Sequence, residues 1–354
     1  MAEGKRLRAV LLPPTPWQPE IDAFRPGEAP SPLELIEGFT ANGIDLVNYD
    51  PGTGLLNPFA NHSTLLQGAD ILRALRVMLT ERRADLVISV HEGGAVPLVL
   101  LRQLMGFGVP IVLWDVGLTE EWKLRERILG LLIPRVEGIC VLSESQKPYI
   151  KARWGRETGV ANILQHVDTK FWMPTPVPPN APMLTVGEDA GRDFATFLKA
   201  VDGLDANIVA KTRKIAPGEA ARHPRLKVIR ERLDFRAFRA LYDQSRFVVI
   251  PLRPVLNPSG VTAILEAGAA GRALVVSNID AIRDFIVPGE TCLTVPPGDA
   301  GAMRAAIRRL LDEPETCARL AANGRRFMEE SFSRPVFMAR FATVLKGFVR
   351  HPAN

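Results

Sequence analysis

The chain has few cysteines and no cysteine pattern that would build a cross-link or a metal site. Its three cysteines, Cys140, Cys292 and Cys317, are far apart in the 354 residues, without a Cys-x-x-Cys pair or a nearby histidine. This spacing argues against a disulfide framework and a zinc site. Cys140 and Cys292 lie in apolar segments, so we expect them to be small buried hydrophobic residues.

Long apolar runs are also missing. No run approaches the roughly 18 to 20 residues that cross a bilayer. The apolar run Ala9–Leu12 near the N-terminus is too short for the core of a signal peptide, and three prolines follow it closely. We therefore expect this run to be the first strand of a cytoplasmic protein.

The first half of the chain lacks a large excess of either charge. Up to residue 175 the sequence has 18 lysines and arginines against 20 acidic residues, and the remainder has 26 against 19. The second half is therefore the better candidate for an anionic ligand. Its basic residues are dispersed, and no pattern resembles a nucleic-acid-binding module, so we expect no nucleic acid partner.

Two motifs are absent, and each absence narrows the chemistry. No Gly-x-Gly-x-x-Gly follows a first strand in either half, which argues against a dinucleotide-dependent dehydrogenase. No Asp-x-Asp-type metal pattern stands in a plausible place, so we expect no metal and no cofactor.

Short apolar runs alternate with amphipathic segments throughout the chain. In the first half the expected strands are Ala9–Leu12, Ile44–Tyr49, Leu86–Val90, Ile111–Trp114 and Ile139–Leu142, and the expected helices are Pro32–Ala41, Leu65–Glu81, Ala95–Phe107 and Ser143–Trp154. In the second half the expected strands are Met183–Val186, Ala206–Ala210, Leu226–Ile229, Phe247–Ile250, Leu274–Ser277 and Leu293–Val295. The helices expected there are Arg192–Val201, Phe235–Asp243, Val261–Ala270, Ala300–Leu311 and Pro314–Glu330. Alternation of buried strands with helices is typical of doubly wound parallel sheets.

These patterns divide the chain into two α/β domains. Residues 175–182 contain four prolines and are interpreted as a semi-rigid linker. The predicted domains are 1–174 and 183–334, each Rossmann-like, with their strand ends facing a central cleft. Residues 335–354 have apolar residues at helical spacing, so we expect a C-terminal helix that crosses back to the first domain.

The segment from Asn257 to Ser277 is the most informative in the chain. It has the pattern of a loop, a helix, a tight turn and a buried strand, with Ser259 and Gly260 just before the helix. A helix start offers free N–H groups and the positive end of the helix dipole, so residues 259–262 (Ser259, Gly260, Val261 and Thr262) predict a phosphate site. Glu266 follows two turns later on the same face, where its carboxylate can accept hydrogen bonds from ribose hydroxyls.

The order of landmarks in the chain resembles retaining GT-B glycosyltransferases, the family that includes sucrose synthases and bacterial mannosyl- and glucosyltransferases. In the second half the matching landmarks are Val186-Gly187, Phe194 to Ala200, Leu241-Tyr242, Val248 to Pro251, Leu265-Glu266-Ala267, Gly271 to Ser277 and Pro297-Gly-Asp299. In the first half the looser matches are His91-Glu92, Val141 to Ser145 and His166 to Phe171. The resemblance implies a GT-B fold and metal-independent transfer of a sugar, with retention, from a nucleotide-sugar held mainly by the second domain.

The resemblance also implies roles for residues that follow strands. Arg192 is at a position where relatives have a basic residue that binds the diphosphate, and its two-pronged guanidinium suits phosphate oxygens. Arg230 is at a position where relatives hold the base. His91, which follows an apolar run and precedes two glycines, is the candidate catalytic residue that steadies charge at the anomeric carbon. It is not assigned as a nucleophile.

This chain departs from the family pattern at two positions. The family has a second glutamate eight residues before Glu266, where it contacts the donor sugar, and this chain has Pro258. Asn257 or Ser259 are the candidates to replace that contact. The arginine that follows the glycine in relatives is Glu188 here, and Lys211 is the candidate to supply the lost charge.

The acceptor is the least determined partner. Trp17, in a proline-rich segment after the first strand, is either an acceptor platform or a packing residue. The segment from Glu120 to Pro134 combines basic residues with an apolar stripe, so it either packs into the core or contacts the inner face of a membrane near a lipid-linked acceptor. Glycan and small-molecule acceptors stay open, as do a non-catalytic nucleotide-sugar scaffold and an epimerase of the same fold. A UDP-sugar is the expected donor, in glycan or glycolipid biosynthesis.

Overall fold

The computed structural model describes residues 6–52, 68–114, 118 and 123–350. Internal contacts divide the chain into two compact units. Unit 1 comprises Met1–Phe24, Ser31–Leu164 and Phe337–Asn354, and unit 2 comprises Arg25–Pro30 and Gln165–Val336. Each unit contains a six-stranded sheet in which the paired strands are parallel, so the expectation of two Rossmann-like α/β domains is confirmed.

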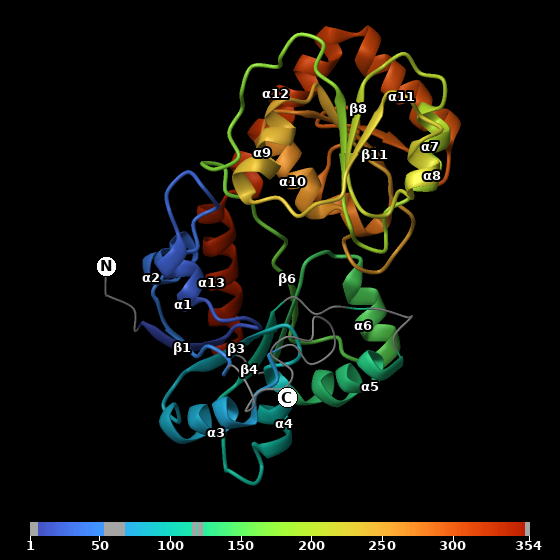
Figure 1. The fold of residues 1–354 in the computed structure, drawn as a ribbon. Coiled ribbons are helices and arrows are strands. Elements are labelled where there is room, and N and C mark those ends of the chain that lie inside the picture. Colours follow the sequence, from blue (N-terminus) through green and yellow to red (C-terminus); the bar gives the residue numbers. More distant parts are fainter. Residues whose placement is uncertain (1–5, 53–67, 115–117, 119–122, 351–354) are drawn as a thin grey trace. The chain divides into compact units, whose positions relative to one another are not determined.

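Unit 1 is built on the strand order β2-β1-β3-β4-β5-β6. The strands are β1 (Leu7–Leu12), β2 (Ile44–Asn48), β3 (Leu86–Val90), β4 (Ile111–Trp114), β5 (Gly138–Val141) and β6 (Val160–Asn162). Its helices are α1 (Gln18–Ala23), α2 (Leu33–Ala41), α3 (Ile71–Thr80), α4 (Ala95–Leu101), α5 (Lys123–Leu132), the short η2 (Ile133–Arg135) and α6 (Gln146–Trp154). Figure 1 shows these helices around the sheet.

Helix α13 (Arg334–Arg350) contributes to the core of unit 1 although it comes last in the chain. Phe337, Phe341 and Leu345 are buried in the cluster that also holds Phe39 of α2 and Trp114 of β4. The Phe341 ring centroid lies 4.8 Å from that of Trp114. The fold of unit 1 therefore includes a segment more than 170 residues beyond its sixth strand.

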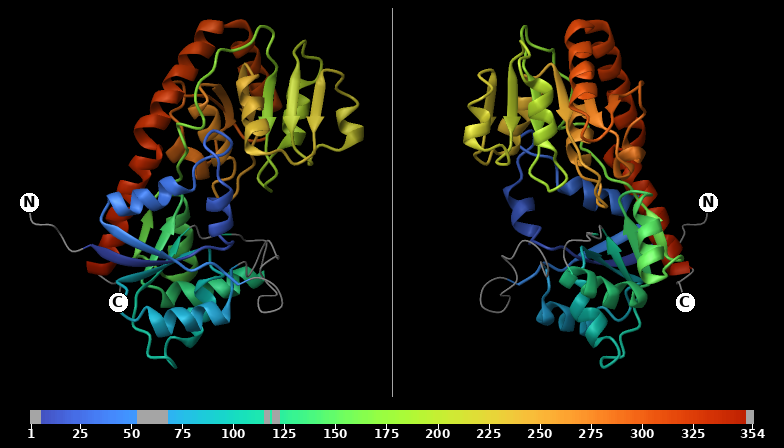
Figure 2. Two further views of the ribbon diagram at one scale, coloured as in Figure 1. Left: turned by 60° about the vertical axis from the view of Figure 1, so that its left-hand side comes forward. Right: turned by 90° about the vertical axis from the view of Figure 1, so that its right-hand side faces the viewer.

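Unit 2 has the strand order β12-β11-β10-β7-β8-β9. The strands are β7 (Met183–Val186), β8 (Ile208–Lys211), β9 (Leu226–Ile229), β10 (Phe247–Ile250), β11 (Ala273–Ser277) and β12 (Leu293–Val295). The helices are α7 (Phe194–Val201), α8 (Pro217–Ala220), α9 (Phe235–Asp243), α10 (Val261–Ala269), η3 (Asp280–Phe285), α11 (Ala300–Asp312) and α12 (Pro314–Ser331). Figure 1 shows α9, α10 and α12 on one side of this sheet and α7, α8 and α11 on the other, and Figure 2 shows its strands side by side.

Unit 2 begins before the proline-rich stretch 175–182, because Arg325 ties preceding residues to it and Arg272 ties Thr175, the first residue of the stretch. Arg325 donates to the carbonyl oxygens of Trp172 (2.7 Å) and Thr169 (3.1 Å). Arg272, which is 2% exposed, donates to both the carbonyl and the hydroxyl oxygen of Thr175. Residues 165–174 therefore pack with unit 2, whereas the composition of the sequence placed them in the first domain.

Several element bounds differ from those predicted, for local reasons. Helix α7 begins at Phe194 rather than Arg192 because the Asp193 carboxylate accepts from the Thr196 N–H and caps it. Helix α6 begins at Gln146 because the Gln146 amide oxygen accepts from the Leu142 and Ser143 N–H groups and holds them in a turn. The three-residue edge strand β6 and the short helices α1 and α8 were not predicted. Residues 65–67 of one predicted helix lie outside the described residues.

Candidate functional site

The loop after β7 and the start of α10 lie next to each other in unit 2. The chain leaves β7 at Gly187, whose N–H donates to the Lys211 carbonyl oxygen (3.2 Å) and whose carbonyl accepts from the Thr212 hydroxyl (2.7 Å). The rest of the loop, up to Asp193, runs beside the segment that links β10 to α10. The backbones pair at Arg192 and Leu252, and the Asp193 N–H donates to the Pro251 carbonyl oxygen (3.0 Å). This is the carboxyl edge of a parallel sheet, where such folds bind ligands.

Arg192 is the charged centre of this edge. Its side chain is only 4% exposed, and its Nε donates to an Asp189 carboxylate oxygen (2.8 Å). Gly187 leaves room for the guanidinium: its φ is +145°, and a Cβ there would overlap the Arg192 side chain. The Arg192 Nη1 atom is buried without a hydrogen-bond partner among the described residues, and it lies 3.2 Å from where a Cβ on Gly260 would be. One edge of the guanidinium is therefore held, and the other is directed to the start of α10.

The start of α10 carries no side-chain cap. Its N-cap is Gly260, which has a φ of +83°, and no side chain of the described residues accepts from its first N–H groups. The Val261 N–H makes only a long bond (3.3 Å) to the Pro258 carbonyl oxygen. An uncapped helix start beside a buried guanidinium is suited to bind an anion.

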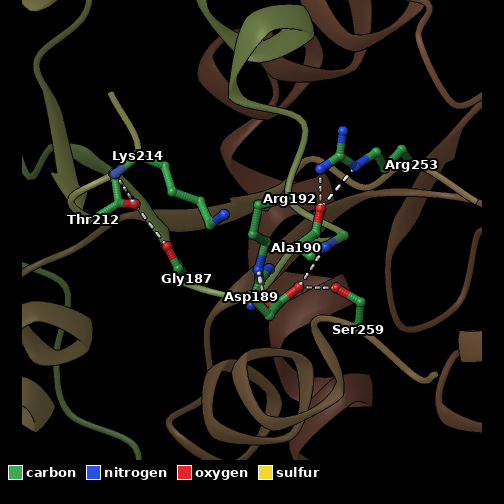
Figure 3. Close-up of polar contacts among 9 residues, drawn as sticks. Gly187, Asp189, Ala190, Arg192, Thr212, Lys214, Arg253 and Ser259 are labelled. Carbon is green, nitrogen blue, oxygen red and sulfur yellow. Dashed lines mark hydrogen bonds and ion pairs between the residues drawn. The ribbon is translucent and has the colours of Figure 1, made fainter. Parts of the chain in front are cut away.

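Asp189 connects the two sides of this edge. Its carboxylate accepts from the Gly191 N–H (3.1 Å), the Arg192 Nε and the Ser259 hydroxyl. Figure 3 shows these contacts. Burial by itself would raise the pKa of Asp189, but the Arg192 charge and these three hydrogen bonds outweigh it, so the pKa is lower than usual. Asp189 is therefore an anion at neutral pH.

Lys211 is at the end of β8, close to the same loop. Its ammonium lies 3.5 Å from the Glu188 carboxylate, which also accepts from the Arg213 N–H (3.1 Å). Lys211 is therefore already paired with the acidic residue that takes the place of the family's arginine. Figure 3 also shows the exposed Lys214 side chain extending toward the Gly187–Arg192 loop, a position that the sequence did not single out.

Glu266 is buried beneath the start of α10. It is 9% exposed, and its Oε2 accepts from the hydroxyl of Tyr242, which is 0% exposed (2.7 Å). Burial raises the pKa of Glu266 to about 7, although the Tyr242 hydrogen bond and the Arg192 charge act in the opposite direction. Burial also raises the pKa of Tyr242 well above its usual value, and the Glu266 charge adds to this effect. The sequence predicted the position of this carboxylate but not its buried hydroxyl partner.

Of two other residues predicted for the donor, Asn257 contributes a backbone contact, and Arg230 contacts a different loop. The Asn257 carbonyl oxygen accepts from the Ser259 N–H (2.6 Å) and shapes the turn before α10. The Arg230 guanidinium donates to the Ile215 carbonyl oxygen (2.7 Å), near α8. The structure thus brings Arg192, Ser259, Gly260 and Val261 together, whereas it turns the Arg230 guanidinium toward a different loop.

The predicted residues of unit 1 are His91 and Trp17. His91 has a left-handed backbone (φ +59°), held by an N–H bond to the Trp114 carbonyl oxygen (2.8 Å) and by the Ser89 hydroxyl, which donates to the His91 carbonyl oxygen (2.9 Å). A left-handed histidine after a strand is uncommon and is often found at functional sites. The Trp17 N–H donates to Asp50 (2.8 Å), and its half-buried side chain packs against the core of unit 1, in line with a packing residue.

The segment expected to meet a membrane is partly described. Residues 120–122 lie outside the described residues. In the rest, Leu129, Leu132 and Ile133 are buried, and Leu124 is 59% exposed, so most of the apolar stripe packs inside unit 1. Among the described residues, no helix is long and apolar enough to cross a membrane.

Asp189, Tyr242, Lys214 and Arg253 are the residues of this region that the sequence did not identify. Arg253 donates through Nε to the Ala190 carbonyl oxygen (2.7 Å) and so fixes the loop from the β10 side. An acidic residue between two glycines right after a strand was the available signal for Asp189. Nothing in the sequence pairs Tyr242 with Glu266, which is 24 residues later.

Comparisons of the sequence with known proteins match the second half of the chain. Residues 189–313 match the family model described as Glycosyl transferases group 1. A glycogen synthase of Mycobacterium tuberculosis is 33% identical over 116 residues, which are 32% of this chain and 27% of that protein. The MMP alpha-(1->4)-mannosyltransferase of Mycolicibacterium hassiacum is 40% identical over 70 residues, 20% of this chain and 17% of that protein. The match therefore spans about a quarter or less of these curated relatives.

The fold has solved neighbours across nearly its whole length. Sucrose-phosphate synthase from Thermosynechococcus elongatus superposes with a TM-score of 0.71 at 16% identity, covering 98% of this chain and all of that one. The Anabaena protein HepE, solved in complex with UDP-glucose, has a TM-score of 0.71 at 14% identity, with 97% and 100% covered. These likenesses establish the fold.

Proposed function

We propose that the chain is a GT-B glycosyltransferase, which transfers a sugar from a nucleoside-diphosphate sugar to a hydroxyl acceptor. The observation that carries the proposal is the buried Arg192 Nη1, which has no partner among the described residues, beside a start of α10 that none of their side chains caps. A guanidinium N–H and several backbone N–H groups together match the oxygens of a diphosphate. Glu266, two turns along α10, is the carboxylate for the ribose hydroxyls.

We propose a UDP-sugar as the donor. HepE, which has the same fold, was solved with UDP and with UDP-glucose. The family match begins at Asp189, within the loop that carries Arg192, so the donor half of the chain is the part with recognisable relatives. The transferred sugar is left unassigned, because Pro258 replaces the glutamate that selects it in the family.

Leaving-group stabilisation is the chemistry that these residues supply in this proposal. The bond between the anomeric carbon and the diphosphate oxygen breaks, and negative charge grows on the diphosphate. Arg192 Nη1 and the α10 N–H groups are in place to balance that charge without a metal. The acceptor oxygen bonds the same carbon on the same face, and its proton leaves with the diphosphate. Retention and metal independence rest on the family resemblance.

His91 is the proposed catalytic residue on the acceptor side. Its left-handed backbone is held by two hydrogen bonds, which fix the direction in which the side chain leaves the backbone. In this proposal the residue steadies positive charge at the anomeric carbon. The acceptor is a hydroxyl of a glycan, a lipid-linked sugar or a small molecule in glycan or glycolipid biosynthesis. A lipid-linked acceptor requires membrane contact, which co-sedimentation with anionic vesicles tests.

Pro258 favours a second candidate, a scaffold that binds nucleotide-sugars without turnover. Proline has no side-chain hydrogen-bonding group, so the sugar contact made by the family's glutamate is lost at this position. This scaffold would keep the phosphate site at α10, because that site is formed by Arg192 and backbone N–H groups.

The test is a binding panel followed by an activity assay. We expect UDP to raise the melting temperature and to bind more tightly than GDP or ADP in calorimetry. Arg192→Ala should lower UDP affinity by about 10- to 100-fold, because a charged contact to phosphate is lost. The matched control is Arg213→Ala, an arginine in the neighbouring loop whose side chain is 73% exposed, and it should change UDP affinity less than 3-fold, about 0.6 kcal/mol.

Activity separates the two candidates. Release of UDP from UDP-sugars in the presence of acceptor hydroxyls supports the transferase, and His91→Ala should abolish most of it while UDP still binds. Tight UDP binding without release of UDP under any condition supports the scaffold. Absence of binding to every nucleoside diphosphate would contradict both.

A further inference from the structure

Asp189 holds the two sides of the phosphate site together through one carboxylate. One oxygen accepts from the Gly191 N–H and the Ser259 hydroxyl, and the other accepts from Arg192 Nε at 2.8 Å. The carboxylate is therefore joined to its own loop, to the Arg192 side chain and to the residue before the N-cap of α10. None of the proposed roles in donor binding includes Asp189.

Which edge of the Arg192 guanidinium Asp189 binds determines which N–H groups are left for a ligand. Asp189 engages Nε, whereas Nη1, which is buried and lacks a partner among the described residues, lies at Gly260. A buried N–H without an acceptor is costly. Asp189 thus leaves open the group that meets the phosphate and fixes the orientation in which it is presented.

The Arg192 guanidinium lies in the space that Gly187 leaves by lacking a side chain, and its orientation there depends on its hydrogen bonds. A flexible arginine loses substantial rotamer freedom when it binds. The loop itself is already fixed by the Arg192–Leu252 backbone bridge and by Arg253 on the Ala190 carbonyl. The remaining freedom is in the Arg192 side chain, and Asp189 removes it.

We propose that Asp189 is a positioning residue of the donor site, which presents Arg192 Nη1 to the diphosphate before the donor arrives. The proposal rests on the proposed function. The rival role is that of a resident anion, which would occupy the place of the phosphate and leave when the donor binds. The open Nη1 edge favours the positioning role, because a resident anion would cover that edge.

The two roles predict opposite changes in UDP affinity for Asp189→Asn. The asparagine keeps the size and can still accept from Ser259 or Gly191, but it cannot hold a guanidinium by charge. We expect UDP and inorganic pyrophosphate to bind about 10-fold more weakly in calorimetry, the loss of one charge-assisted orientation. Uridine, which has no phosphate, should bind with unchanged affinity.

Two controls distinguish an effect on the orientation of Arg192 from a general effect of lost negative charge or of misfolding. Glu188→Gln removes the neighbouring carboxylate of the same loop, which pairs with Lys211 rather than Arg192, and it should leave UDP binding unchanged or slightly tighter. In an Arg192→Ala background, Asp189→Asn should change UDP affinity less than 2-fold, because the side chain that Asp189 positions is gone. If Asp189→Asn does not fold, Asp189→Glu displaces the carboxylate with its charge intact and should show the same selective loss.

The outcomes are distinct. A wild-type protein that binds neither UDP nor pyrophosphate removes the proposed function itself. If the wild type binds both and Asp189→Asn binds them equally or more tightly, the positioning role is overturned in favour of the resident anion. A loss that extends to uridine, or that persists in the Arg192→Ala background, also overturns it.

Discussion

At the scale of single residues, the sequence indicated which charged residues belong to the candidate site, but it did not predict their hydrogen-bond partners. Glu266 was predicted for the donor because it follows a helix start, and Arg192 because the family resemblance implies a basic residue at its position. Their partners, Asp189 and Tyr242, come from loop closure and from a separate helix, so only packing places them. Lys211 shows the converse: as a free cation it was a candidate, but in the fold it is paired with Glu188.

The burial of Glu266 predicts how stability depends on pH. Its pKa is raised to about 7 in the folded protein, above the ordinary value of 4.5, so between these values the folded state holds more protons than the unfolded state. Stability from this residue is therefore greatest at low pH and is lost as pH rises through 7. We expect wild type to lose on the order of 1–3 kcal/mol against Glu266→Gln between pH 5 and 8, measured by urea unfolding.

Tyr242→Phe provides the control. Loss of the hydroxyl removes a hydrogen bond that lowers the pKa of Glu266, so the transition should move to higher pH. A wild-type stability difference from Glu266→Gln that stays constant from pH 5 to 8 would show that Glu266 keeps an ordinary pKa.

At the scale of elements, buried strands were predictable, and their ends were less so. Both sheets contain the expected runs, because continuous apolar segments in a parallel sheet have few alternatives. The missed elements β6, α1 and α8 are too short for periodicity to reveal. Helix starts were misplaced where a side chain caps the helix, as at Asp193, or holds a turn ahead of it, as at Gln146.

The loop after β7 gives an element-scale prediction. Gly187→Ala adds a Cβ that meets the Arg192 side chain, so UDP affinity should fall at least about 10-fold because Nη1 is displaced. Gly203→Ala is the matched control, since Gly203 also has a positive φ (+66°) in unit 2 but has open space where a Cβ would go. Gly203→Ala should lose about 1 kcal/mol of stability through backbone strain, and Gly187→Ala should lose more, because a φ of +145° is almost confined to glycine and the added Cβ overlaps Arg192. Only Gly187→Ala should lose UDP binding in calorimetry.

Equal UDP affinities in these two variants would show that displacing the Arg192 guanidinium does not affect UDP binding. Such a result would also weaken the assignment of Arg192 to the diphosphate.

At the scale of the whole molecule, the chain does not divide where its composition changes. The prolines of residues 175–182 indicated a linker, whereas Arg325 holds Trp172, just before this stretch, and Arg272 holds Thr175, its first residue, within unit 2. Unit 1 in turn is completed by α13, whose apolar face joins the cluster around Phe39 and Trp114. Each unit therefore depends on residues that are distant in the sequence.

Phe341→Ala tests this dependence. Phe341 is 0% exposed and lies against Trp114, so its truncation should destabilise unit 1 by about 3–5 kcal/mol. Unit 2 does not include this residue, so UDP affinity below the unfolding transition should be unchanged. Thermal unfolding with and without UDP measures both effects. Thr343→Ala, an exposed change on the same helix, is the control, and an equal loss in both variants would contradict the core role of Phe341.

The sequence by itself determined two α/β domains with parallel sheets and a helix that begins just after Ser259 and Gly260, because strand burial and helix ends are local properties of residue type and spacing. Through the resemblance to a known family, it also singled out Arg192 as a candidate for the diphosphate. Only the tertiary structure decided that Asp189 holds Arg192, that Tyr242 meets Glu266 and that α13 completes unit 1. These contacts join residues that are brought together by the closing of loops and the packing of helices. Neither periodicity nor composition predicts which distant residues will meet.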